Sequence, residues 1–265
     1  MSKDPMSSRR NFIRVSAAAG TGILVAGFAA GAAADDKPPR RPNGKAPPPP
    51  PKTTKPDPKD AKDDTKDDTA EDDITPPEDL MRQHGVLQRL LLVWDEAVRR
   101  VDGKLNFPVD SLLASAKLMR SFVEDYNEHL EEEYIFPRFR QANKLVNTVT
   151  LLKAQHDAGR KATDVVLQLA TADGIKDAES RTKLADAMRQ SIRMYYPHMA
   201  REATVIFPLF RDFITQDEYD ALGDTFEKEE EKHLGEDGFP KVVDQVAEIE
   251  KKFGILDLAQ YTPKS

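Results

Sequence analysis

The sequence has 265 residues, a formal net charge of −7 at pH 7 and no cysteine. The lack of cysteine excludes disulfide bonds, thiolate zinc sites, cysteine-ligated iron–sulfur clusters and cysteine nucleophiles in this chain. Any metal must therefore be held by imidazole and carboxylate groups, a donor set that suits iron, zinc or manganese. The acidic balance after residue 34 argues against nucleic acid or an anionic membrane surface as a partner.

Residues 1–34 are predicted to be a targeting segment. The stretch from Ser8 to Arg14, which contains Arg9-Arg10, matches the bacterial twin-arginine signal pattern, and an Ala/Gly-rich run follows it. Small residues precede Asp35, so we expect cleavage there and export to the periplasm. The alternative is a retained membrane anchor, because the run is long enough to span a bilayer, although it is mostly Ala and Gly.

Residues 35–77 are rich in Pro, Lys and Asp and include the proline run from Pro47 to Pro51. Almost no large apolar residue occurs before Ile74, so this stretch cannot bury enough surface to offset the entropy of ordering. We expect a disordered linker here. The folded domain is then expected over residues 78–255, with a tail over residues 256–265.

Four long helical patterns follow the linker. Thr75 and Glu78 form a predicted capping box at the first, and Thr215 and Glu218 form another after the fourth. Periodic apolar residues and breaking signals predict helices over residues 75–101, 108–141, 144–172 and 178–213, then shorter helices over 215–233 and up to Gly254. Short connections make neighbouring helices antiparallel. The sequence therefore predicts an all-α fold, an up-down-up-down four-helix bundle with additional C-terminal helices.

Four of the five histidines follow a repeated order along these helices: a lone His, a His-x-x-x-Glu pair, a lone His and a second such pair. A spacing of four places an imidazole and a carboxylate on one helix face. Buried charges of this kind would be costly without a counter-ion, so the pattern predicts a site for divalent cations. The predicted metal ligands are His84, His129, Glu133, His156, His198 and Glu202.

The local motifs resemble those of the hemerythrin-like (HHE cation-binding) family over about residues 79–253. They are the segments from Leu80 to Leu87, from Leu130 to Pro137, from Gln155 to Arg160 and from Pro197 to Glu202. The resemblance implies a four-helix bundle with a non-haem di-iron centre, so the expected cofactor is two iron ions, with other divalent metals as alternatives. It carries the ligand role onto His84, His156, His198 and Glu202.

The second helix departs from the family pattern. Pro208 follows His198 by ten residues, whereas Pro137 follows His129 by only eight. Aligning the two prolines would put Asn127 at the position of the histidine, and this alignment needs a local helix defect such as a π-bulge.

Helical phase favours a different choice in this helix. At about 100° per residue, His129 and Glu133 lie on the flank that matches the second His-x-x-x-Glu pair. We therefore expect His129 and Glu133 to be the ligands. Glu132, or Glu131 together with Asn127, is the alternative.

The resemblance implies several functions that the sequence separates poorly. The first hypothesis is an exported protein that binds a small ligand such as O₂ or NO, or that handles iron. The second is a peroxidase- or oxidase-type di-iron enzyme, with Tyr126, Tyr195 and Tyr196 as candidate donors of protons or electrons. The third is a metal-free helical interaction module. His233, in an acidic stretch, is interpreted either as part of a solvated face or as a residue near the site entrance.

Overall fold

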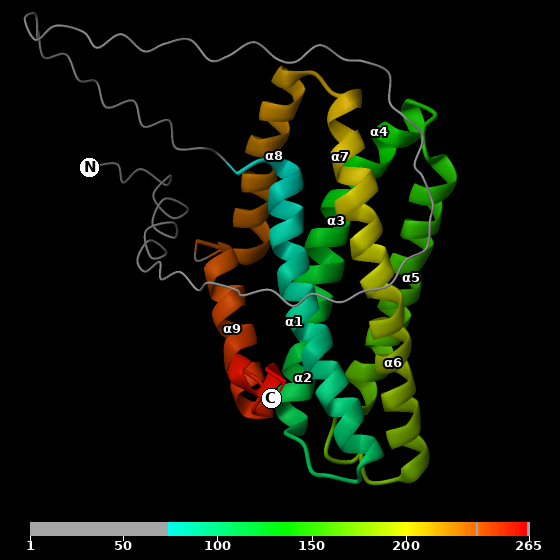
Figure 1. Ribbon diagram of the computed structural model, residues 1–265, viewed down its shortest axis with the longest axis vertical. Helices are drawn as coiled ribbons and strands as arrows, with labels where there is room; N and C mark the ends of the chain where they lie inside the picture. The colour runs from blue at the N-terminus through cyan, green and yellow to red at the C-terminus, as the bar shows by residue number, and fades with distance from the viewer. Residues whose placement is uncertain (1–73, 237, 264–265) are drawn as a thin grey trace, which may run out of the picture. The chain divides into compact units, whose positions relative to one another are not determined.

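The computed structural model describes residues 74–236 and 238–263 (Figure 1). The predicted signal segment and residues 35–73 of the predicted linker lie outside the described residues. Within the described ranges, no helix is both long enough and apolar enough to cross a membrane.

The predicted all-α fold is confirmed, since the described residues contain helices and no strand. Four long antiparallel helices form the bundle, and α8 and α9 pack along one side of it (Figure 1). The first bundle helix is α1 (Pro76–Asp102) and the third is α5 (Val146–Leu169). Two shorter helices, α8 (Gln216–Leu234) and α9 (Gly238–Phe253), precede the 3₁₀ turn η7 (Leu258–Tyr261).

The second and fourth bundle helices are composite. The second, over residues 109–141, consists of α2 (Val109–Leu118), the π-helical η3 (Met119–Asn127), α3 (Glu128–Leu130), the π-helical η4 (Glu131–Ile135) and α4 (Phe136–Gln141). The fourth, over residues 178–213, consists of α6 (Ala178–Arg201), the π-helical η5 (Glu202–Ile206), α7 (Phe207–Phe210) and the 3₁₀ turn η6 (Arg211–Phe213).

A proline explains the π-helical turn in two of these places. Pro137 has no N–H, so the carbonyl of Glu133 loses its usual partner, and the proline ring also displaces that carbonyl. Pro208 does the same to the carbonyl of Thr204. The turn before each proline widens to the π-helical hydrogen-bond pattern, and it begins at Glu131 in one helix and at Glu202 in the other.

The bundle interior is a continuous apolar core of Leu, Val, Met and aromatic side chains from all four helices. The one tryptophan, Trp94, is fully buried, and its indole N–H donates to the Ser115 hydroxyl at 3.0 Å. Both predicted capping boxes are present, at Thr75 with Glu78 and at Thr215 with Glu218.

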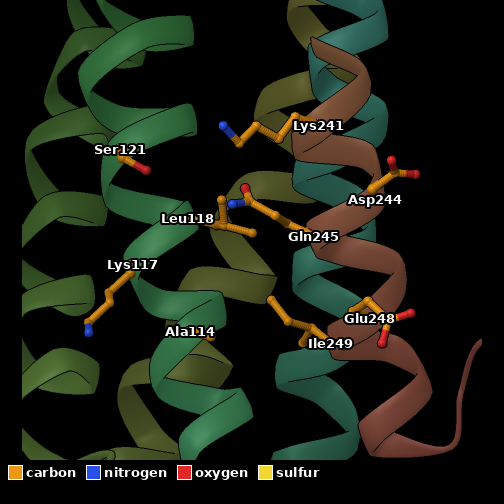
Figure 2. A pocket seen from close by; sticks show the side chains of 9 residues that line it. All are labelled: Ala114, Lys117, Leu118, Ser121, Lys241, Asp244, Gln245, Glu248 and Ile249. Atoms are coloured by element: carbon orange, nitrogen blue, oxygen red, sulfur yellow. The ribbon is translucent and has the colours of Figure 1, made fainter. Parts of the chain in front are cut away.

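A surface groove of about 630 Å³ lies between the second bundle helix and α9 (Figure 2). Apolar side chains such as Leu118 and Ile249 line it together with charged ones such as Lys117 and Glu248. None of its lining residues is one of the histidines and glutamates predicted as metal ligands.

Candidate metal centre

Four acidic and imidazole side chains converge in the middle of the bundle. Glu131, His156, His198 and Glu202 each offer one ligand atom, and these four atoms all lie within 4.8 Å of one another. They come from η4, α5, α6 and η5, and none of the four side chains is more than 3% exposed. We call this set the buried cluster.

Short distances connect the members of the buried cluster. The Nε2 atoms of His156 and His198 are 3.1 Å apart. His198 Nε2 lies 3.1 Å from Glu202 Oε2, and His156 Nε2 lies 3.4 Å from Glu131 Oε2. Each carboxylate is therefore adjacent to at least one imidazole nitrogen.

His84, on α1, approaches the same two carboxylates. Its Nε2 atom lies 3.3 Å from Glu131 Oε1 and 3.5 Å from Glu202 Oε2, and the residue is only 4% exposed. Glu131 and Glu202 are thus each shared between His84 and a histidine of the buried cluster. Carboxylates shared in this way can bridge two metal ions.

Outer hydrogen bonds fix two of the imidazole rings. His156 Nδ1 donates to Glu132 Oε1 at 2.9 Å, and His198 Nδ1 donates to Gln155 Oε1 at 3.0 Å. Because these bonds hold Nδ1 on the outer side of each ring, the Nε2 atom of each ring faces the cluster. This is the outer-shell arrangement that orients histidine ligands toward a metal.

The structure does not bring His129 and Glu133 into the cluster. His129 is half-buried, with its ring 6.0 Å from that of His233, and Glu133 is exposed. The carboxylate of this helix that enters the cluster is Glu131, the alternative that the spacing to the proline indicated. His233 donates from Nδ1 to the carbonyl of Glu229 at 2.9 Å, and its side chain is partly exposed.

The position of His129 and Glu133 outside the cluster has a physical cause. Each residue of a π-helical turn advances less than the about 100° of an α-helix, so phases extrapolated across η3 and η4 drift. The drift turns His129 to the flank that packs against α8 and brings Asn127 and Glu131 inward, where they are 3% and 0% exposed.

In each half of the bundle a phenylalanine stacks on one of the histidine rings. Phe136 stacks on the His156 ring with centroids 5.6 Å apart, and Phe207 stacks on the His84 ring at 5.5 Å. Both phenylalanines belong to the repeated Ile-Phe-Pro that ends a π-helical turn. Each π-helical turn therefore supplies one glutamate to the site, and the residue directly after it supplies one aromatic ring.

Without a cation, protons on His156 and Glu202 balance the buried negative charge of the site. Burial alone would lower the pKa of His156, but the charges of Glu128, Glu131 and Glu132 outweigh it and raise that pKa to about 10. Burial and the charge of His156 lower the pKa of His198 to about 4. Burial raises the pKa of Glu202 and the charge of Glu131 adds to it, so Glu202 favours its protonated form.

The donor set fits a divalent metal. Both oxygens of Glu202 and Oε2 of Glu131 are buried without a hydrogen-bond partner. An unpaired buried carboxylate is costly, and a cation between these oxygens and the imidazole nitrogens would remove that cost. Mixed imidazole and carboxylate ligands suit iron, zinc or manganese.

The family model of the hemerythrin HHE cation binding domain matches residues 75–210. The chain belongs to this family. The matched range contains the whole hemerythrin-like site, from His84 on α1 to Phe207 on α7.

Relatives of this hemerythrin-like chain occur in mycobacteria. Proteins of Mycobacterium tuberculosis and Mycobacterium bovis, both described as uncharacterized, are 48% identical to it over 190 residues. The match covers 72% of this chain and 74% of each relative. No solved structure is significantly similar to the chain.

Sequence reasoning missed the role of Gln155 in the hemerythrin-like site, and it gave Glu131 only as an alternative. Gln155 directly precedes the predicted ligand His156, and its amide oxygen accepts a hydrogen bond from a second predicted ligand, His198. Asn127 appeared only as an alternative. The repeated Ile-Phe-Pro was the available signal, because its isoleucine lies four residues after Glu131 in one helix and four residues after Glu202 in the other.

Proposed function

We propose that the protein is a non-haem iron protein whose two iron ions bind a small ligand such as O₂ or NO. One observation supports this most: Glu131 and Glu202 are buried, three of their four oxygens accept no hydrogen bond, and three imidazoles face them. Bound iron would supply redox electrons and coordination positions for the ligand.

The residues of the chain do the remaining work. His84, His156 and His198 would hold the ions together with Glu131 and Glu202, and the outer hydrogen bonds of Gln155 and Glu132 keep two rings oriented. Stacked phenylalanines and the surrounding core exclude bulk water. A small uncharged ligand can enter such a site without the desolvation penalty that a charged one would have.

A second candidate function is peroxide reduction, which one observation favours. The hydroxyl of Tyr195 is buried beside the cluster and donates to Glu128 Oε1 at 2.9 Å, and the Tyr195 ring lies 5.9 Å from that of His198. A buried phenol bonded to a carboxylate is a suitable donor of an electron and a proton. An enzyme of this kind would consume peroxide catalytically, whereas a carrier would bind its ligand stoichiometrically.

We also propose that the protein works outside the cytoplasm. The Arg9-Arg10 signal pattern supports export, and a twin-arginine route carries proteins that fold before export. Cell fractionation tests this: the mature protein should occur in the exported fraction and begin near Asp35. An Arg9→Lys, Arg10→Lys variant should stay in the cytoplasm, and export of that variant would contradict the proposal.

The ligand is tested by optical spectroscopy of protein loaded with Fe(II) without oxygen. Addition of O₂ or NO should produce a new visible absorption band at a ligand-to-protein ratio near one. The His198→Ala variant, treated identically, should show none. Loaded protein that responds to neither gas but turns over peroxide would favour the enzyme, and one that does none of these would overturn both functions.

A further inference from the structure

The two halves of the site share an outer hydrogen bond as well as a stacked phenylalanine. Each lone histidine follows a glutamine, in Gln83-His84 and in Gln155-His156. Gln155 Oε1 accepts the proton of His198 Nδ1 at 3.0 Å. Gln83 Oε1 accepts from Asn127 Nδ2 at 3.1 Å, with both residues buried.

These bonds identify Asn127 as the counterpart of His198. Each lies four residues before the glutamate that begins a π-helical turn, Glu131 in one half and Glu202 in the other. Each is held by the glutamine of a Gln-His pair on a neighbouring helix. The Nδ2–H of the asparagine thus reproduces the outer bond that the Nδ1–H of a histidine makes.

The asparagine does not reproduce the inner contact. The imidazole of His198 presents Nε2 to the cluster, 3.1 Å from Glu202 Oε2. The shorter side chain of Asn127 uses its amide nitrogen for Gln83, and no atom of Asn127 contacts His84, Glu131 or Glu202 in a hydrogen bond. The half of the site around His84 is therefore one imidazole short.

We propose that the two metal positions are unequal. A first ion is held by His156 and His198 with the two carboxylates, and a second, held by His84 and the same carboxylates, binds more weakly and is filled last. This inference rests on the proposed function, because it assumes that the site takes metal. Loss of an outer-shell partner alone weakens metal affinity about 10–100-fold, so a missing imidazole should separate the two affinities by at least about tenfold.

A competition titration of metal-free protein with Zn²⁺ and a chromophoric chelator measures both affinities. Zn²⁺ serves as the probe because it has no redox chemistry and accepts the same donors. The wild type should bind one tight equivalent and a second at least about tenfold weaker. In Asn127→His the new ring can donate Nδ1–H to Gln83 and direct Nε2 inward, so the weak equivalent should tighten at least about tenfold.

Matched variants separate the possible outcomes. Asn127→Ala should leave the tight equivalent in place and should not tighten the weak one. His84→Ala should remove only the weak equivalent, whereas His198→Ala should remove the tight one. If Asn127→His does not fold, these two variants alone test whether the two metal positions are unequal. Two equally tight equivalents in the wild type, or loss of the tight equivalent in His84→Ala, would overturn the inference alone. Failure to bind any metal would overturn the proposed function with it.

Discussion

The Nε2 atoms of His156 and His198 face each other at 3.1 Å inside a fully buried site, with Glu131 and Glu202 beside them. The Nδ1 atoms of both rings donate to oxygens outside the cluster. What lies between the two Nε2 atoms must then be a proton or a metal ion. Metal binding is therefore expected to release protons and to weaken as the pH falls.

The choice between two carboxylates on the second bundle helix is testable by substitution. Glu131→Ala should abolish most metal binding, because it removes a buried carboxylate that contacts His84 and His156. His129→Ala, two residues from Glu131 in sequence but outside the cluster, should keep the wild-type metal content. Metal analysis of both purified variants checks this, and loss of metal in His129→Ala alone would contradict the site described here.

The hydrogen bond from His198 to Gln155 should increase metal affinity, although Gln155 is not one of the proposed ligands. Gln155→Ala leaves His198 Nδ1 without its acceptor and frees the ring to rotate. Zinc affinity at the tight position should fall about 10–100-fold. The control is Asp157→Ala, two residues along the same helix, whose carboxylate is exposed. Equal affinities of the two variants would show that the glutamine does not orient the ring.

Gly159 makes room for the Tyr195 hydroxyl. A Cβ atom at this glycine would meet that hydroxyl oxygen, so Gly159→Ala should destabilise the protein by about 1–3 kcal/mol. Gly223→Ala on α8 is the control, since a Cβ there meets nothing within 4 Å, and it should gain about 0.5–1 kcal/mol from helix propensity. Denaturant unfolding measures both. Adding Tyr195→Phe to Gly159→Ala should recover part of the loss.

Buried Glu124 should make the metal-free protein less stable at high pH. Burial raises its pKa to about 7 from an ordinary 4.5, although Thr163 donates to it and Arg120 lies 2.9 Å away. Its contribution is complete below about pH 4.5 and is lost as the pH rises through 7, by up to about 3 kcal/mol.

The Glu124→Gln variant should remove this dependence, because the amide does not ionise. Unfolding curves of metal-free wild type and variant at pH 5 and pH 8 make the comparison. The wild type should lose more stability than the variant between these pH values. Parallel losses would show that Glu124 is not the group responsible.

The helices and three of the histidines could be predicted from the sequence because apolar periodicity, capping boxes and breakers act locally. Glu131 could not be chosen over Glu133 by periodicity, because the π-helical turn before Pro137 changes the rotation per residue. The repeated Ile-Phe-Pro contained the answer, since Glu131 and Glu202 stand at the same distance from it. The hydrogen bonds of Gln83 and Gln155 depend on neighbouring helices and have no local signature.

The metal content of the mature protein tests the central claim most directly. Protein produced with ample iron and little oxygen should contain close to two iron ions per chain by elemental analysis, or between one and two if the weaker position empties during purification. His198→Ala and Glu202→Ala, purified in parallel, should contain far less and should unfold at a lower temperature. Wild-type protein with less than about half an equivalent of any transition metal, or variants with the full content, would contradict the account.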